Sequence, residues 1–427
     1  MHTLDLNIGE ISKIEGKASL SVKIEDGEVK ECKFKIDEFK RFYTQAIRGK
    51  DVLALPQLTS RICGTCSNAH LLCAIKAVEN ALEITPTVQT EILRKLLNFG
   101  LIIRDHALHL YVFVMPDLLG VDNILDLDEN DPKHHQILDD TFRVKASGNN
   151  LSKVIGGRSV HAPYPTVGGF TKLPNQNLFP GLIKELENTR PAILRLIKIF
   201  QECDSNLERD TDYVALIDDE FSFLKGCIIK NENLTITCQD FRRYLDGVVI
   251  PYSHAMGYKF MEKIHMIGAL SRLNLAKDRL NIRTKEDTNK ALRLFPSKNI
   301  FHNNLAQAIE ILHAVDSSVD ILSNLSIKDE KPIPIIRKAG VGIGVIEAPR
   351  GTLYYKLAID KDGKVINGDI VVPTGQNQVG IERSIYEYIK ANLNKNKEEL
   401  TNEIEQIIRA YDPCMSCASH FLKVNWL

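Results

Sequence analysis

The sequence lacks an excess of charge of either sign, since its 427 residues include 54 lysines and arginines and 55 aspartates and glutamates. Without a basic surplus there is no electrostatic case for binding nucleic acid or acidic membranes. It also lacks a long apolar run, because the most apolar stretch, residues 107–119, contains His109, Pro116 and Asp117. That stretch is too short and too polar for a membrane span, and no secretory signal is visible at the N-terminus. We therefore expect a cytoplasmic protein.

Internal repeats, low-complexity linkers and a glycine-rich phosphate-binding fingerprint are also missing. Their absence argues against a repeat protein and against nucleotide binding by this chain. The composition is that of a globular protein with a sizeable core, at 44% hydrophobic and 26% charged residues.

Cysteines number nine, an odd count in a chain without a visible signal, which favours reduced thiols over disulfides. Five of them lack iron–sulfur spacing and are expected to be small buried apolar residues: Cys32, Cys73, Cys203, Cys227 and Cys238. The other four form two C-x-x-C pairs.

Hydrophobic periodicity predicts a helix-rich α+β fold with a central helical bundle, and the length of 427 residues allows one large domain or two to three ordinary ones. Alternating residues flank Asp26-Gly27 and Asp362-Gly363, so each dipeptide marks a β-hairpin. Proline should end one helix near Pro116 and break or start another at Pro191. Helices are expected over residues 67–82, 88–114, 177–207, 254–280, 303–325, 379–393 and 400–411, whereas residues 208–250 give no clear pattern. The predicted regions are an N-terminal β-hairpin region at about 1–60, a helical core at about 61–330, and a C-terminal β region with a metal-binding end at about 331–420.

The two C-x-x-C pairs lie about 350 residues apart and consist of Cys63, Cys66, Cys414 and Cys417. Two thiolates at this spacing can bind one metal, and two pairs brought together make a four-sulfur site. On this chemistry alone, structural zinc, a redox or catalytic metal, an iron–sulfur cluster and no metal all stay open. The neighbouring Arg61, Asp412, His70 and His420 are more than a structural zinc site requires.

Longer motifs surround these cysteines. Residues 61–70 read R-x-C-G-x-C-x-x-x-H, and residues 412–420 read D-P-C-x-x-C-x-x-H. Together they resemble the signature pair of the nickel–iron hydrogenase large subunit. Further segments similar to that family occur in order at residues 13–16, 106–117, 156–161, 168–170, 303–308, 347–351 and 372–377. Their compact form is most similar to the cytoplasmic NAD(P)-linked class, which includes the archaeal sulfhydrogenase alpha subunit.

The resemblance implies a nickel–iron centre on the four cysteines and the reaction H2 ⇌ 2H⁺ + 2e⁻. Nickel would bind all four sulfurs, and iron carrying carbon monoxide and cyanide would share Cys66 and Cys417. Cys63 and Cys414 would then be terminal ligands of nickel. Electrons would leave through an iron–sulfur small subunit docked near residues 61–70, with flavin and NAD(P) subunits of diaphorase type beyond it.

The resemblance also implies roles for residues around the metals. Arg350 would stand above them as a fixed cation, braced by Asp117 and Asp412. Pro349 would shape the same wall, and Thr374 would hydrogen-bond a cyanide.

Proton transfer would begin at Glu15, the first carrier beyond a terminal cysteine. His70 would be a hydrogen-bond donor near a bridging sulfur, whereas His106, His109 and His161 are expected to be hydrogen-bonded core residues.

The chain departs from the family pattern at two places and keeps one further family feature at its end. Thr44 stands where the family has a glutamate that, with the histidine matching His420, helps bind magnesium or iron, so this third metal is in doubt or uses another group such as Glu38. Tyr354 and Tyr355 stand where many members carry histidine. The seven residues after His420, 421–427, resemble a tail that a maturation endopeptidase removes.

Two non-catalytic alternatives remain. One is a hydrogenase-like scaffold subunit of a redox complex, although such relatives lack the cysteine pairs. The other is a zinc-stabilised interaction protein.

Overall fold

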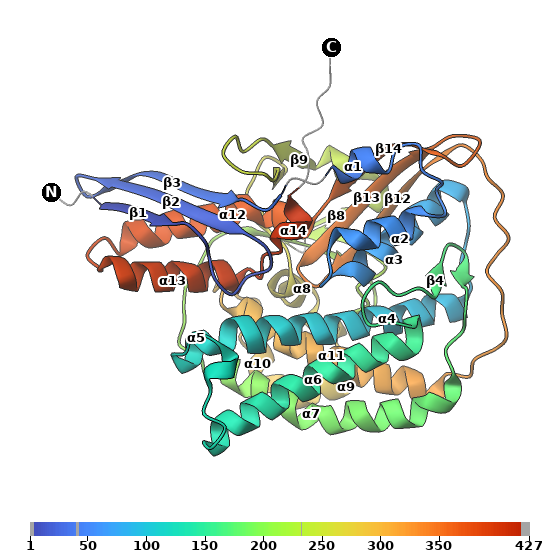
Figure 1. The fold of residues 1–427 in the computed structure, drawn as a ribbon, viewed down its shortest axis with the longest axis horizontal. Coiled ribbons are helices and arrows are strands. Elements are labelled where there is room, and N and C mark those ends of the chain that lie inside the picture. The colour runs from blue at the N-terminus through green and yellow to red at the C-terminus, as the bar shows by residue number, and fades with distance from the viewer. Residues whose placement is uncertain (1–3, 40–41, 232, 420–427) are drawn as a thin grey trace, which may run out of the picture.

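Four long helices form one layer of the computed structural model, which describes residues 4–39, 42–231 and 233–419. They are α4 (Val88–Ala107), α6 (Pro132–Gly156), α7 (Phe179–Gln201) and α11 (His302–Asn324), drawn in the lower half of Figure 1. Helix α4 packs against α6 and α11, and α11 packs against α7. The predicted helix-rich α+β fold is confirmed.

Local chemistry sets the ends of these helices. The Thr87 hydroxyl accepts a hydrogen bond from the Thr90 amide at 3.1 Å and caps α4. Helix α6 begins after Asp131, whose carboxylate accepts hydrogen bonds from two amides of the first turn. It ends at Gly157, whose φ of 87° lies in the left-handed region that glycine adopts readily.

Two prolines do not end helices as predicted. A π-helical turn at Leu108–Val114 leads from α4 into α5 (Met115–Leu119), where Pro116 sits in the first turn. Helix α7 continues through Pro191. The helix predicted over residues 254–280 is wrong in its first half, which forms β10 (Gly257–Phe260) and β11 (His265–Met266) before α8 (Ala269–Ala276).

The unassigned residues 208–250 form strands. These are β6 (Asp212–Ile217), β7 (Cys227–Lys230), β8 (Leu234–Ile236) and β9 (Leu245–Val248). One sheet has the order β11-β6-β7-β8, and β9 pairs with β10. Buried side chains of these strands form a second apolar cluster together with residues of neighbouring elements, among them Phe241 and Tyr354.

The N-terminal sheet has three antiparallel strands, β1 (Leu4–Ile8), β2 (Ala18–Glu25) and β3 (Glu28–Ile36). The predicted turn at Asp26-Gly27 is confirmed, and both residues have positive φ, as hairpin turns of this length require. Strand β1 was not predicted. The sheet lies beside α12 (Pro373–Ala391) and α13 (Lys397–Ala410), which contact β3 and β1 respectively (Figure 1).

The C-terminal sheet consists of β12 (Gly340–Ala348), β13 (Gly351–Ile359) and β14 (Val365–Val371), with the predicted turn at Asp362-Gly363. Helix α3 (Ser67–Leu82) packs closely on β12 because Gly340, Gly342 and Gly344 present no side chains. A Cβ atom at these positions would lie 2.2, 2.0 and 2.3 Å from carbonyl oxygens of α3. This approach sets the helix that follows Cys66 against the strand that precedes Arg350.

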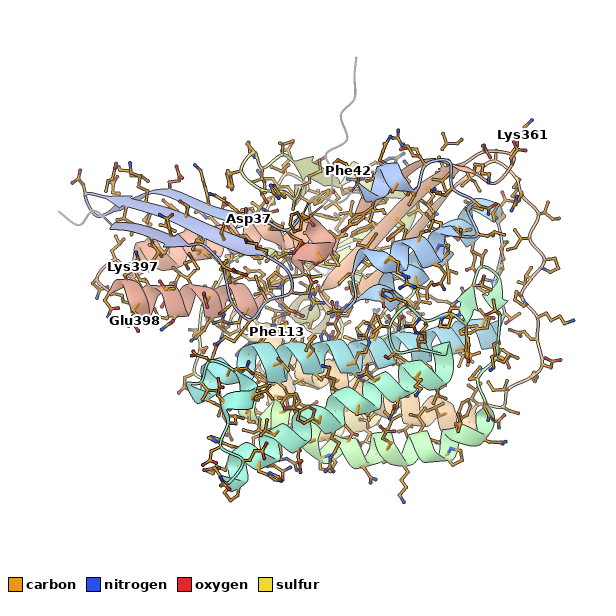
Figure 2. The ribbon with its side chains drawn as sticks, viewed as in Figure 1. Asp37, Phe42, Phe113, Lys361, Lys397 and Glu398 are labelled. Atoms are coloured by element: carbon orange, nitrogen blue, oxygen red, sulfur yellow. The ribbon has the colours of Figure 1, made fainter. Side chains whose placement is uncertain are left out.

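Helix α14 (Met415–Ala418) lies near the middle of the molecule, between the N-terminal and C-terminal sheets (Figure 1). The labelled charged residues Lys361, Lys397 and Glu398 lie at the periphery (Figure 2). Shorter elements complete the described chain: α1 (Tyr43–Ala46), α2 (Leu55–Thr59), α9 (Ile282–Asp287), α10 (Asn289–Leu292), β4 (Pro165–Thr166), β5 (Gly169–Phe170) and the single turns η1 (Ser60–Ile62), η3 (Ile124–Asp126), η4 (Gln176–Leu178), η5 (Cys238–Arg243) and η6 (Lys277–Arg279). None of the helices described has the length and apolarity to cross a membrane.

Candidate metal centre

The four cysteines of the two pairs meet in the interior. The Sγ atoms of Cys66 and Cys417 are 3.0 Å apart, those of Cys63 and Cys414 are 3.5 Å apart, and those of Cys414 and Cys417 are 3.1 Å apart. All four sulfurs lie within 4.8 Å of one another, and each cysteine is at most 5% exposed. The sequence prediction of one four-sulfur site is therefore confirmed.

Backbone contacts hold the second pair in place. The Met415 amide donates to the Glu15 carbonyl at 2.9 Å, so the turn before β2 lies against the chain before α14. The Thr374 hydroxyl, in the first turn of α12, accepts a hydrogen bond from the Cys414 amide at 2.8 Å. Asp412 has a φ of 49°, a left-handed conformation that turns the chain from α13 into the cysteine pair.

The Glu15 carboxyl group contacts this cluster directly. Its Oε2 atom lies 3.0 Å from the Cys414 sulfur and accepts a hydrogen bond from the Ser416 amide at 3.1 Å. Burial, and next the charge of Cys63, raise the pKa of Glu15. The group is thus suited to hold a proton beside a sulfur.

Arg350 lies close to the cluster and is held there by two carboxylates. Its guanidinium forms ion pairs with Asp105 and Asp412, each at 3.0 Å, and its side chain is 4% exposed. Arg350, Pro349 and Thr374 line a small cavity that also touches Cys66, Cys414 and Cys417. The structure thus brings a fixed cation to the sulfurs.

Asp117 does not brace Arg350, contrary to the prediction. It pairs instead with Lys13 at 2.7 Å and with Arg409 at 2.6 Å. Asp105, which lies twelve residues earlier in α4, takes its place. A signal was present in the sequence, because Asp105 immediately precedes the histidine motif at residues 106–111.

Arg272 is a second site residue that sequence reasoning missed. Its guanidinium donates hydrogen bonds to the Ala348 and Pro349 carbonyls at 3.2 and 3.0 Å, and it pairs with Glu310 and Glu347 at 2.6 and 2.7 Å. It therefore holds the segment that ends at Arg350. No local motif marks Arg272, which stands in a short helix between strands.

His106 and His109 are buried and hydrogen-bonded, as predicted for core residues. His106 contacts Glu310 at 2.8 Å, and His109 contacts Gln307 at 2.6 Å and the Arg409 carbonyl at 2.8 Å. His161 is only half-buried, and its amide donates to the Ser67 hydroxyl at 3.0 Å.

His70 lies against the cluster. Its Nε2 atom is 3.5 Å from the Cys417 sulfur, and its Nδ1 atom is 2.7 Å from the Tyr355 hydroxyl. Burial lowers the pKa of His70 to about 4, so the imidazole is neutral at physiological pH.

Comparison with known proteins agrees with this geometry. The family model described as nickel-dependent hydrogenase matches residues 41–155 and 251–420. The chain belongs to the nickel-dependent hydrogenase family. It is 30% identical to the sulfhydrogenase 1 alpha subunit of Pyrococcus furiosus, over 99% of both chains. It is 26% identical to the beta subunit of the NAD-reducing hydrogenase HoxS of Cupriavidus necator, over 98% of this chain and 95% of that one.

Solved structures share the hydrogenase fold. An NAD⁺-reducing nickel–iron hydrogenase in the H2-reduced state superposes with a TM-score of 0.88 at 23% identity, covering 98% of this chain and 100% of that one. The Ni-Fe-Se hydrogenase from D. vulgaris Hildenborough in the reduced state gives 0.76 at 17% identity, with the same coverage.

The residues present fit the nickel–iron centre of this hydrogenase family. Four soft sulfur donors are buried in mutual contact, the ligand type that nickel and iron accept. Contact with Cys414 lowers the pKa of Cys63, while burial raises the pKa values of Cys414 and Cys417. Four thiolates this close repel one another, so a bound cation is what allows all of them to ionise.

His420, the predicted ligand of the third metal, lies outside the described residues, and so does the tail 421–427. Thr44 lies in α1, and the neighbouring Tyr43 hydroxyl donates to the Ser416 carbonyl at 2.6 Å. This contact ties α1 to the cysteine-bearing turn. The third metal itself stays a prediction.

Proposed function

We propose that this hydrogenase chain is the catalytic large subunit of a cytoplasmic enzyme that interconverts H2 with protons and electrons. Two features of the buried four-sulfur cluster carry the proposal: the contact of Glu15 with the Cys414 sulfur, and the cavity that Arg350 shares with Cys66, Cys414 and Cys417. A nickel–iron centre with carbon monoxide and cyanide on iron would supply the redox chemistry that splits H2 heterolytically. Residues 1–427 would act as one domain in this role.

The cysteines divide into two kinds in this proposal. Cys66 and Cys417 would each bind both metals, which their 3.0 Å sulfur contact supports. Cys63 and Cys414 would each bind nickel alone. Of these, Cys414 lies against Glu15, so its sulfur is the one placed to exchange a proton with a carboxyl group.

Glu15 would exchange a proton with the Cys414 sulfur. A proton on the Cys414 sulfur has Oε2 of Glu15 as its acceptor at 3.0 Å. The raised pKa brings the carboxyl group closer to the working pH, where a carrier both takes and releases a proton readily.

Arg350 would act as a fixed positive charge beside the reacting site. Its ion pairs with Asp105 and Asp412 hold the guanidinium in one place. Pro349 would shape the cavity wall. Thr374 accepts from the Cys414 amide through its oxygen, which leaves its hydroxyl proton available for a cyanide nitrogen.

Electrons need a partner. The four-cysteine cluster is the one group of metal-binding side chains found in residues 4–39, 42–231 and 233–419. These residues therefore provide no second metal cluster that could carry electrons away from the centre. We propose an iron–sulfur small subunit docked near residues 61–70, where Arg61 and Gly64 are exposed while Cys63 is buried. The relatives' names, an alpha subunit of a sulfhydrogenase and a subunit of an NAD-reducing hydrogenase, support further flavin and NAD(P) subunits of diaphorase type.

Maturation completes the proposal. A maturation endopeptidase would remove residues 421–427 once nickel is bound, and magnesium or iron would bind near His420. The intact mass of the active subunit tests the first point, since a full-length mass would contradict it.

Metal analysis and infrared spectroscopy of the purified complex test the main proposal. We expect nickel and iron in the sample, and infrared bands from iron-bound carbon monoxide and cyanide. Cys417→Ser should abolish H2 uptake, whereas the matched control Cys203→Ser, at a half-buried cysteine that does not belong to the cluster, should not. Zinc alone in the wild-type protein, or H2 uptake retained by Cys417→Ser, would overturn the proposal.

A further inference from the structure

Tyr355 is a buried tyrosine of β13 that reaches the metal centre through His70. Its hydroxyl lies 2.7 Å from Nδ1 of His70, and Nε2 of the same ring lies 3.5 Å from the Cys417 sulfur. The two rings meet edge to face, with centroids 6.1 Å apart and planes at 69°. The tyrosine is 0% exposed, so water does not compete for either contact.

The direction of these hydrogen bonds follows from the chemistry of the sulfur. A metal-bound Cys417 is a thiolate and has no proton to donate, so the proton between the two residues must belong to Nε2 of His70. A neutral imidazole carries one N–H, which makes Nδ1 the acceptor. The Tyr355 hydroxyl must then be the donor to Nδ1.

We propose that Tyr355 is a positioning residue that fixes the tautomer and orientation of His70, so that its Nε2–H points at the Cys417 sulfur. The inference rests on the proposed function, because it takes Cys417 to be a metal ligand. Outer hydrogen bonds of this kind set which ring nitrogen carries the proton.

Donation from Nε2–H to the thiolate withdraws electron density from a sulfur bound to the redox metals. Hydrogen bonds to metal-bound sulfur are one means by which proteins set reduction potentials. Because hydrogen bonds in a chain polarise one another, the Tyr355 hydroxyl also strengthens the bond at the far side of the ring. Loss of that hydroxyl should therefore shift the centre to a lower potential.

The adjacent Tyr354 is a matched control. It is equally buried, but successive side chains of a strand point to opposite faces, and its ring stacks on Phe241 at 4.7 Å in the second apolar cluster. Its hydroxyl meets no hydrogen-bond partner in the part of the chain that the structure describes. Tyr354→Phe and Tyr355→Phe thus each delete one buried hydroxyl from the same strand, and only the second faces His70.

The test uses the assembled, metal-loaded complex. Nickel per chain is measured first, and the midpoint potential of the nickel signal is then followed by paramagnetic resonance during a redox titration. We expect a lower midpoint for Tyr355→Phe and the wild-type value for Tyr354→Phe. In a His70→Phe background, Tyr355→Phe should cause no further shift, because the ring that relays its effect is gone.

A second variant covers the case in which Tyr355→Phe fails to load nickel. Replacement of Tyr355 by 3-fluorotyrosine keeps the shape and makes the phenol a stronger donor, so the midpoint should rise. An unchanged midpoint in both variants, or an equal shift for Tyr354→Phe, would overturn the role of Tyr355. Absence of nickel from the wild-type complex would instead contradict the proposed function.

Discussion

Replacing Asp105 by asparagine tests how Arg350 is held beside the metal centre. Asp105 is 0% exposed and lies 3.0 Å from the Arg350 guanidinium, which is itself 4% exposed. Its charge also acts on the neighbouring Arg104, a buried arginine whose pKa burial lowers and the Asp105 charge raises. The substitution therefore removes a negative charge that acts on two buried cations.

The magnitude follows from these contacts. Removing one partner of a buried ion pair costs about 3–5 kcal/mol, because the other charge is left uncompensated. Arg350 keeps Asp412 at 3.0 Å, so the loss should lie near the lower figure, about 3 kcal/mol. The guanidinium should also lose its fixed position, which lowers H2 uptake per bound nickel.

The measurement compares Asp105→Asn with Asp117→Asn by urea unfolding, nickel content and H2 uptake. Asp117 is 8% exposed and pairs with Lys13 and Arg409, so its loss should also reduce stability. It does not contact Arg350, and H2 uptake per nickel should therefore stay near the wild-type value. Equal losses of uptake in the two variants would refute the assignment of Asp105 as the brace.

Three further predictions concern pH, packing and proton transfer. Burial lowers the pKa of His313 to about 4, so its contribution to stability is complete above about pH 6.5 and is lost as pH falls toward 4, by up to about 3 kcal/mol. Urea midpoints should fall less over this window in His313→Asn. Gly342→Ala places a Cβ 2.0 Å from a carbonyl oxygen of α3, so it should lower the free energy of unfolding by about 1–3 kcal/mol and lower the nickel content. Gly181→Ala, which has open space around it, should be neutral or stabilising in the same assays. Glu15→Gln should reduce H2 uptake per nickel by at least about 100-fold, with Glu10→Gln as an exposed control.

Sequence reasoning recovered the elements whose signals are local. The turns at Asp26-Gly27 and Asp362-Gly363, and helix α3 over residues 67–82, appear where the periodicity placed them. Residues 208–250 could not be assigned because their strands are short and pair across long separations, as β6 does with β11. The helix predicted at 254–280 failed because apolar residues in β10 and β11 are buried on both faces, which hides a strand period.

The sequence predicted those residues of the site that belong to a recognisable motif. The four cysteines, Glu15 and Arg350 all meet as their motifs implied. Which carboxylate faces Arg350 was harder to predict. Asp105 adjoins the histidine motif, but Asp105 and Asp117 lie on the same helical stretch, and the rotation of that stretch in the fold decides which of them meets Arg350. The π-helical turn between them changes that rotation.

The buried charged residues around the site differ in what they contact. For this reason, membership of a motif does not by itself show that a residue lies at the metal centre. Glu347 belongs to the same motif as Arg350, yet it faces away from the sulfurs and pairs with Arg272 at 2.7 Å. Buried ion pairs seldom add stability over well-packed apolar residues, so their number here is not explained by folding alone. They do fix geometry, since Arg272 also binds the carbonyls of Ala348 and Pro349. We infer that a hydrogenase motif contains two kinds of residue: those that contact the metals, and those that fix the position of the residues that do. Only the contacts in the structure show to which kind a given residue belongs.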